Sequence, residues 1–291
     1  MSKRLKIYLA LFAAAIVLLM YLEYTKPKPI DWTKTYSAKD KIPFGAFVLA
    51  EELPKLFPDK NIEIIDKQSI TTFMIDNDNV LSGDNSTLFI LSGNNLYDGN
   101  FDYLLDFVKN GNDVFFVTNN FPKSLQDTLK LKKNTFIANI FKKNSYTIYS
   151  ILCNNYLDTT KYYFKKQNSF SYFFDFDIKN TVVLGQYVCD SSIYTNFIKT
   201  SFGNGNFYIN LLPEAFTNYY MLNDSTFEYA VNSLNYIKKS NIYFYEYKKS
   251  KKVNENESLL MYIFANPPLH WAWLIFIWGM VIYALFAGKR L

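Results

Sequence analysis

Polar side chains that could bind a ligand follow two of the apolar runs in this sequence. Ser92 and Asn94 come directly after residues 87–91 (TLFIL), and Asn119 comes directly after residues 114–118 (VFFVT). In open α/β sheets, ligands bind outside the carboxyl ends of the strands. We therefore expect Ser92, Asn94 and Asn119 to border a binding edge. The alternative is that they belong to ordinary strand-to-helix loops.

A second candidate is the segment Phe216-Thr217-Asn218-Tyr219-Tyr220, which lies between a predicted strand and a predicted helix. Thr217 and Asn218 offer polar groups, and Tyr219 and Tyr220 offer aromatic faces on which a ligand can stack. The competing interpretation is structural, because Asn and Thr side chains in loops often bond to the backbone. Both interpretations stay open at this point.

Several common catalytic centres are excluded between the two apolar ends of the chain. His270 is the only histidine, so a Ser-His-Asp site, a Cys-His site or a histidine-based zinc site cannot form there. No phosphate-binding glycine loop is present. We expect no catalytic residue, no metal and no cofactor. The enzymatic alternative is a carboxylate-based hydrolase acting on cell-envelope material, using Asp98, Asp102 or Glu214.

The elements that would position these residues alternate between strands and helices. Apolar periodicity predicts helices and strands in the order helix 43–56, strand 61–66, strand 87–91, helix 101–108 and strand 114–118. This order is typical of an α/β fold with an open, mostly parallel sheet and right-handed crossovers. Residues 134–180 are less regular and suggest an antiparallel insertion.

The later part of the chain continues the sheet. A strand is predicted at 181–184, a hairpin with a glycine turn at 197–212, and a last strand at 241–247. Ser225 and Glu228 match a capping box that would open a helix. The two cysteines, Cys153 and Cys189, permit a disulfide but also suit buried free thiols.

Two long apolar stretches, 5–22 and 269–286, lie at the ends of the chain, and each approaches the ~20 residues needed to cross a bilayer. A cleaved signal peptide is the rival interpretation of the first stretch, but no small-residue cleavage site follows it. The expected organisation is a transmembrane helix at 1–24, a linker at 25–42, an extracytoplasmic α/β domain at 43–248, a linker at 249–266, a transmembrane helix at 267–287 and a cytoplasmic end at 288–291.

The charge distribution bears on orientation and on partners. Lys289 and Arg290 follow the second apolar stretch, which places both termini in the cytoplasm. The net charge is +5, and the 31 basic residues are scattered among 26 acidic ones. No basic stripe is present, so we expect no nucleic-acid partner.

Three stretches together resemble a known bacterial family: PFG at 43–45 with the helix that follows it, LPEAFTNYYML at 212–222, and LLMYIFANPPLHWAW at 259–273. The family is the membrane-anchored "domain of unknown function 4350". The resemblance implies an α/β domain similar to the flavodoxin-like and class I amidotransferase-like folds, without the amidotransferase nucleophile. Family members usually continue past Lys289-Arg290 into a cytoplasmic tail, whereas this chain ends at Leu291.

The resemblance also implies two membrane spans and a genetic neighbourhood with a MoxR-type AAA ATPase and its membrane-bound partners. The resulting expectation is a non-enzymatic, membrane-tethered binding or scaffold subunit in the bacterial inner membrane, with a periplasmic domain. Its partners would be the lipid bilayer and the proteins of a membrane complex. An accessory subunit of a transporter is a further alternative beside the hydrolase.

Overall fold

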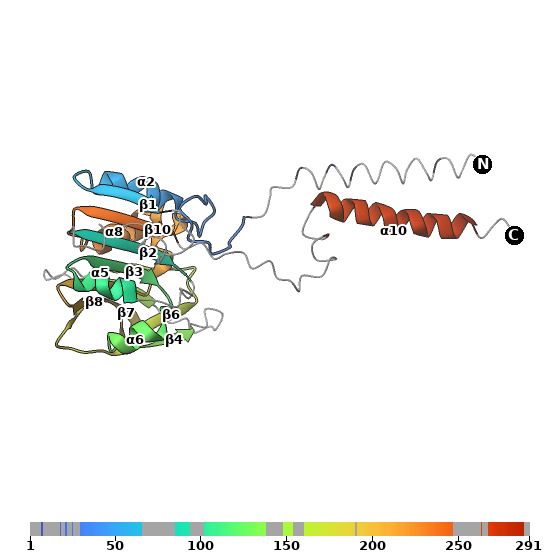
Figure 1. The fold of residues 1–291 in the computed structure, drawn as a ribbon. Helices are drawn as coiled ribbons and strands as arrows, with labels where there is room; N and C mark the ends of the chain where they lie inside the picture. Colours follow the sequence, from blue (N-terminus) through green and yellow to red (C-terminus); the bar gives the residue numbers. More distant parts are fainter. Residues whose placement is uncertain are drawn as a thin grey trace. The chain divides into compact units, whose positions relative to one another are not determined.

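The computed structural model describes residues 30–65, 85–93, 102–137, 148–153, 160–189, 191–246 and 267–287, together with the single residues Ile7, Leu18, Tyr21, Thr25 and Ile263. The chain divides into two units, Met1–Tyr247 and Lys248–Leu291, which are described separately. In the first unit the described strands form one ten-stranded sheet (Figure 1).

One half of this sheet is parallel. Its strands lie in the order β1 (Asn61–Ile65), β10 (Asn241–Glu246), β2 (Ser86–Ser92), β3 (Asp113–Thr118) and β9 (Gly205–Asn210). Every residue of β2 and β3 is buried. Continuous apolar runs suit this position because both faces of a central parallel strand are covered. The predicted strands at 87–91 and 114–118 are therefore confirmed.

The other half is antiparallel, so the sheet is mixed rather than mostly parallel. β9 forms a hairpin with β8 (Ser192–Phe202), and the turn contains Gly203 at a φ of 59°. β8 then pairs with two partners: β7 (Thr181–Cys189) along most of its length and β6 (Ser169–Asp175) at one position. The predicted glycine hairpin is confirmed.

Two further strands complete the antiparallel half. β6 pairs with β4 (Lys132–Ile137), which ends the described order of the sheet, and β7 pairs with β5 (Ile148–Leu152). This confirms the antiparallel insertion that was predicted within 134–180, as far as these residues are described. Cys153 and Cys189 are not joined to each other by a disulfide.

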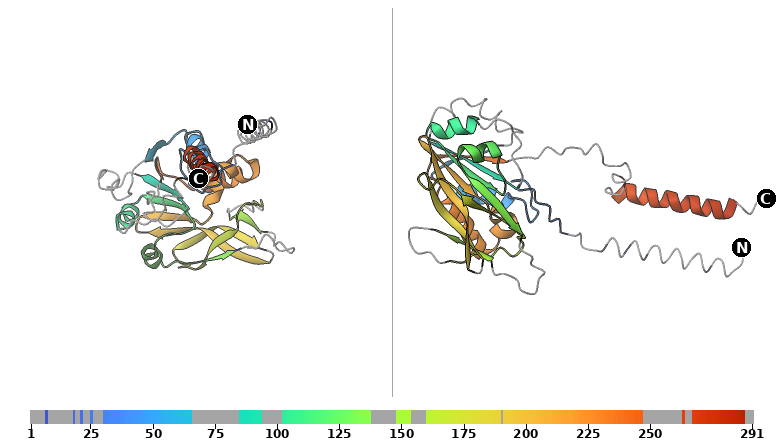
Figure 2. Two further views of the ribbon diagram at one scale, coloured as in Figure 1. Left: turned by 90° about the vertical axis from the view of Figure 1, so that its right-hand side faces the viewer. Right: turned by 90° about the horizontal axis from the view of Figure 1, so that it is seen from below.

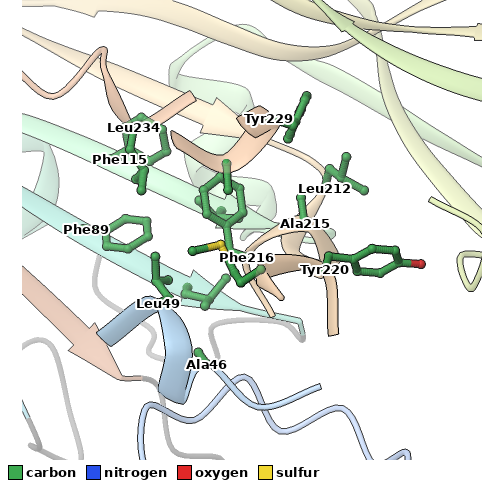
Figure 3. Packing of buried hydrophobic residues seen from close by; sticks show 14 of the residues in the cluster. Ala46, Leu49, Phe89, Phe115, Leu212, Ala215, Phe216, Tyr220, Tyr229 and Leu234 are labelled. Carbon is green, nitrogen blue, oxygen red and sulfur yellow. The ribbon is translucent and has the colours of Figure 1, made fainter. Parts of the chain in front are cut away.

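Helices cover both faces of the sheet. One face carries α2 (Phe47–Leu56), α7 (Asn218–Met221) and α8 (Asp224–Leu234), and the other carries α5 (Asp102–Lys109) and α6 (Lys123–Thr128) (Figure 2). Because side chains alternate along a strand, odd-numbered Phe89 and Phe115 pack on the first face, and even-numbered Ile90 and Phe116 pack on the second. Figure 3 shows the buried residues on the first face of the sheet, with Phe89 and Phe115 near Phe216.

Two predicted helix starts are corrected. The first helix begins at Phe47 rather than residue 43, because Gly45 donates its N–H to Ile42 O in a preceding turn. The predicted capping box is wrong. Ser225 lies inside α8, whose N-cap is Asn223, and the Ser225 hydroxyl bonds to the Asn223 side chain.

The second unit contains α10 (Pro267–Ala287). Among the residues that the structure describes, no helix is both long enough and apolar enough to cross a membrane. Most of residues 1–24 lie outside the described part.

This finding corrects the prediction of two transmembrane helices flanking the α/β domain. It also removes the basis for the predicted inner-membrane location, for the cytoplasmic termini and for a periplasmic domain, since all three followed from those spans. Part of the predicted linker at 25–42 is ordered against the sheet, because Tyr36 and Ala38 are buried in the core.

Candidate ligand-binding site

A pocket of about 370 Å³ lies where β2 and β3 end. Ser92 and Thr118 are paired at the carboxyl ends of these strands, and Gly93, Asn119 and Asn120 follow them into the pocket. The remaining walls come from the N-terminal segment and from the antiparallel strands β4 and β6. They consist of Lys34, Tyr36, Lys133, Thr135, Ser169 and Ser171.

A buried carboxylate organises one side of this pocket. Glu214 lies in the 3-10 helix η1 (Pro213–Phe216), two residues beyond Leu212, and is 0% exposed. Its Oε1 accepts hydrogen bonds from Lys34 Nζ at 2.7 Å, Tyr36 OH at 3.2 Å and Asn119 Nδ2 at 3.4 Å. All three donors line the pocket, so one carboxylate fixes three of its side chains. The ammonium of Lys34 supplies the opposite charge that a buried carboxylate requires.

Tyr36 contributes a fixed, protonated phenol. Burial, and then the negative charge of Glu214, raise the pKa of Tyr36 far above its ordinary value. The hydroxyl therefore stays protonated at neutral pH and donates a hydrogen bond to Glu214. The Tyr36 ring lies directly against Gly93, leaving no room for a side chain at that position.

Some oxygen atoms in this region have no hydrogen-bond partner among the described residues. They are Glu214 Oε2, Asn119 Oδ1 and the hydroxyl of Thr35. Buried polar atoms in proteins are nearly always hydrogen-bonded to protein or to ordered water. These oxygen atoms can therefore accept further hydrogen bonds.

The antiparallel wall is made of hydroxyl groups and one ammonium. Thr135 on β4 and Ser171 on β6 are direct cross-strand partners, and their Oγ atoms are 2.9 Å apart. Lys133 is partly buried, and this burial lowers the pKa of its ammonium group. No described carboxylate forms a salt bridge with Lys133, whereas the neighbouring Lys132 pairs with Asp175 at 2.7 Å on the surface.

The residues predicted at the strand ends have different positions. Asn119 lines the pocket, as described above. Ser92 is 3% exposed and closes β2 immediately before the pocket-lining Gly93. Asn94 lies outside the described residues.

The second predicted segment connects parts of the fold. Phe216 is in the hydrophobic core, and the Thr217 hydroxyl donates to Glu214 O at 2.6 Å. Tyr219 is 37% exposed and packs edge-on against Trp32, with ring centroids 5.5 Å apart. None of these three side chains lines the pocket.

Asn218 makes the most connections of that segment. Its Oδ1 accepts from Val48 N at 2.8 Å, and its Nδ2 donates to Asp40 O at 2.8 Å and to Ile42 O at 2.7 Å. Val48 is in the first turn of α2, whose own N-cap, Ala46, has no side-chain acceptor. Asn218 therefore caps a helix that lies 170 residues earlier in the chain.

The two described carboxylates of the hydrolase alternative, Asp102 and Glu214, do not converge. Asp102 is exposed in the first turn of α5, Glu214 is buried, and Asp98 lies outside the described residues. The pocket lining contains no carboxylate among the residues that can be described. Within the same residues, no cluster of His, Cys, Asp and Glu side chains is placed to hold a metal ion.

Sequence reasoning missed most of the lining. Lys34 and Tyr36 fell within a predicted linker, and Lys133, Thr135, Ser169 and Ser171 fell within or beside an irregular region. The one available signal was the alternation of polar residues at 133 and 135 and at 169 and 171, which places each pair on one face of a strand.

No family model matches this chain, and no curated protein is significantly similar to it. The resemblance to the "domain of unknown function 4350" family is therefore neither supported nor refuted.

Proposed function

We propose that this protein is a non-enzymatic binding subunit that holds a small polar ligand in the pocket at the carboxyl ends of β2 and β3. The observation that carries the proposal is the buried Glu214 carboxylate, which holds Lys34, Tyr36 and Asn119 in the pocket wall. Side chains fixed before a ligand arrives lose little conformational entropy on binding, and this favours affinity.

The lining favours binding over catalysis. Polar groups converge on the pocket from four parts of the chain, but the described lining contains no carboxylate, histidine or cysteine that would act as a base or nucleophile. Ligand sites at this edge are common in open α/β sheets.

The test is a screen of small polar compounds by thermal shift, repeated on a variant with the pocket filled. Thr135→Trp places a large ring in the pocket from the exposed strand β4. Asn134→Trp is the matched control, because Asn134 is also exposed on β4 but does not line the pocket. Compounds that bind as proposed raise the melting temperature of the wild type and of Asn134→Trp but not of Thr135→Trp.

Three results would overturn the proposal. The first is that no compound stabilises the wild type, and the second is that Thr135→Trp responds as strongly as the control does. The third is that mass spectrometry detects turnover of a compound that binds in the pocket, which would make the protein an enzyme.

The protein partners remain a separate part of the proposal. The family resemblance implies an assembly with a MoxR-type AAA ATPase. Affinity purification of the tagged protein from the cells that make it, followed by identification of the co-purifying proteins, tests this association. Recovery of the protein alone would remove it.

A further inference from the structure

We infer that the ligand of this pocket carries a phosphate group, which the Lys133 ammonium and the hydroxyls of Thr135, Ser169 and Ser171 bind on the antiparallel wall. This inference deepens the proposed function and rests on it. It concerns the chemical class of the ligand and the side of the pocket at which its charged group binds.

The charge balance of the pocket favours an anion. Two ammonium groups line it, but Glu214 neutralises only one of them, through the 2.7 Å contact with Lys34. Lys133 has no described carboxylate partner, and it is partly withdrawn from water. A partly buried, unpaired charge is costly, and an oppositely charged ligand compensates for that cost.

The hydrogen-bonding groups of the pocket also favour an anionic ligand. An ammonium group only donates hydrogen bonds, and a hydroxyl group donates one. The bond between Thr135 and Ser171 uses the hydrogen of one of these two hydroxyls and leaves the other hydrogen available. Lys133, Ser169 and one hydroxyl of the Thr135–Ser171 pair thus present several donors to the pocket. A ligand group that complements them must offer acceptors.

The number of donors distinguishes phosphate from carboxylate. A phosphate monoester has three strongly accepting oxygens and a charge of about −1.5 to −2 at neutral pH, whereas a carboxylate has two oxygens and a single charge. Lysine binds phosphate as a point charge and requires no planar, two-pronged geometry. A lysine among serine and threonine hydroxyls fits a tetrahedral anion better than a planar one.

The pocket has space for the rest of the ligand beside the phosphate group. Lys133 and the hydroxyls lie on β4 and β6, whereas Tyr36 comes from the N-terminal segment and Asn119 follows β3. A volume of about 370 Å³ exceeds that of a phosphate ion. The organic part of a phosphate ester would then contact the wall that Glu214 organises.

The experiment measures binding of inorganic phosphate by calorimetry at constant ionic strength, with acetate in parallel as the carboxylate probe. Lys133→Met removes the unpaired ammonium. Lys132→Met is the matched control, since Lys132 is the adjacent residue of β4 but pairs with Asp175 outside the pocket. We expect Lys133→Met to weaken phosphate binding by about tenfold and Lys132→Met by less than about twofold. Acetate should bind more weakly than phosphate.

Folding controls keep the result interpretable. The unfolding midpoint of Lys133→Met should match or exceed that of the wild type, because the variant loses an uncompensated charge. If this variant does not fold, Lys133→Gln replaces it, and Ser171→Ala tests the hydroxyl wall separately with an expected loss of several-fold.

Three results would each overturn the inference. They are an equal loss of phosphate affinity in the two lysine variants, unchanged phosphate binding in Lys133→Met, and acetate binding as tight as phosphate binding. Uncharged compounds that bind the wild type but not Thr135→Trp, without phosphate binding, would overturn it while leaving the proposed function intact. If neither phosphate nor any compound of the screen binds, both fail.

Discussion

The ring of Tyr36 occupies the space that a side chain at residue 93 would need. A Cβ atom on residue 93 would collide with Tyr36 Cε2. Because of this close approach, the N-terminal segment packs against the end of β2. The Tyr36 hydroxyl can then donate a hydrogen bond to Glu214. The glycine at the end of β2 is thus a condition for one wall of the pocket.

Gly93→Ala should destabilise the protein by about 1–3 kcal/mol, because the added methyl group must displace a packed aromatic ring. Tyr36→Ala opens that space, so adding Gly93→Ala to it should cost much less. The free energies of unfolding of the two single variants and the double variant, from urea titrations, measure this coupling. The same cost of Gly93→Ala in both backgrounds would contradict the contact.

Lys34→Met should destabilise the protein by about 2 kcal/mol, because it leaves the fully buried Glu214 without its cation. The value is below that of a fully buried pair, since the Lys34 side chain is 44% exposed. In a Glu214→Gln background the same substitution should cost little. A urea-unfolding cycle checks this, and additive effects of the two substitutions would count against the ion pair.

Asn218→Ala should cost about 3 kcal/mol, because three backbone groups lose their bonds to this side chain. Asn218→Asp should be similarly harmful, since a carboxylate can accept from Val48 N but repels the carbonyls of Asp40 and Ile42. Asn134→Ala, at an exposed position, is the control and should change the unfolding free energy by less than about 0.5 kcal/mol. A mild effect of Asn218→Asp would show that the two donated bonds matter little.

Stability should decrease at alkaline pH because of buried tyrosines. Burial, and then the charge of Asp113, raise the pKa of Tyr208 to about 12. In the unfolded chain this phenol ionises near pH 10, so between about pH 10 and 12 the unfolded state binds fewer protons than the folded state does. The stabilisation is complete below about pH 10 and is lost as the pH rises through about 12.

Urea titrations across this range, with phenolate absorbance, follow the effect. The loss attributable to Tyr208 is about 2 kcal/mol, and Tyr208→Phe should make the pH dependence shallower by that amount. The other buried tyrosines with raised pKa values, such as Tyr187 and Tyr229, act in the same direction. An identical pH dependence in Tyr208→Phe and the wild type would refute the assignment.

The fold could be predicted from sequence where local patterns decide the structure. β2 and β3 are continuous apolar runs, and the helix at 102–109 follows a clear amphipathic repeat. The order of the strands could not be predicted. β10 was expected as a strand, but its position between β1 and β2 depends on pairing with segments more than 150 residues away, and no local pattern reports such pairing.

The candidate site could be predicted only in part. Asn119 was found because it follows a recognisable buried strand. Lys133 and the hydroxyls of β4 and β6 were missed, since their relation to β3 exists only once β8 has bridged the parallel and antiparallel halves. Glu214 was a candidate carboxylate of the hydrolase alternative. Its burial, and its hydrogen bonds from three side chains far away in the sequence, could not be predicted from the neighbouring residues.

The position of β10 has a consequence for how the chain assembles during translation. This strand separates β1 from β2, yet it is the last strand of the sheet to leave the ribosome. Until residue 246 has emerged, β1 lacks its pairing partner and β2 keeps one open edge. Sheet closure must then wait for contacts of very long sequence separation, which are slow to form. The nascent protein therefore passes through a period in which an apolar parallel strand is exposed to other chains, and chaperone binding at β2 would be most valuable then.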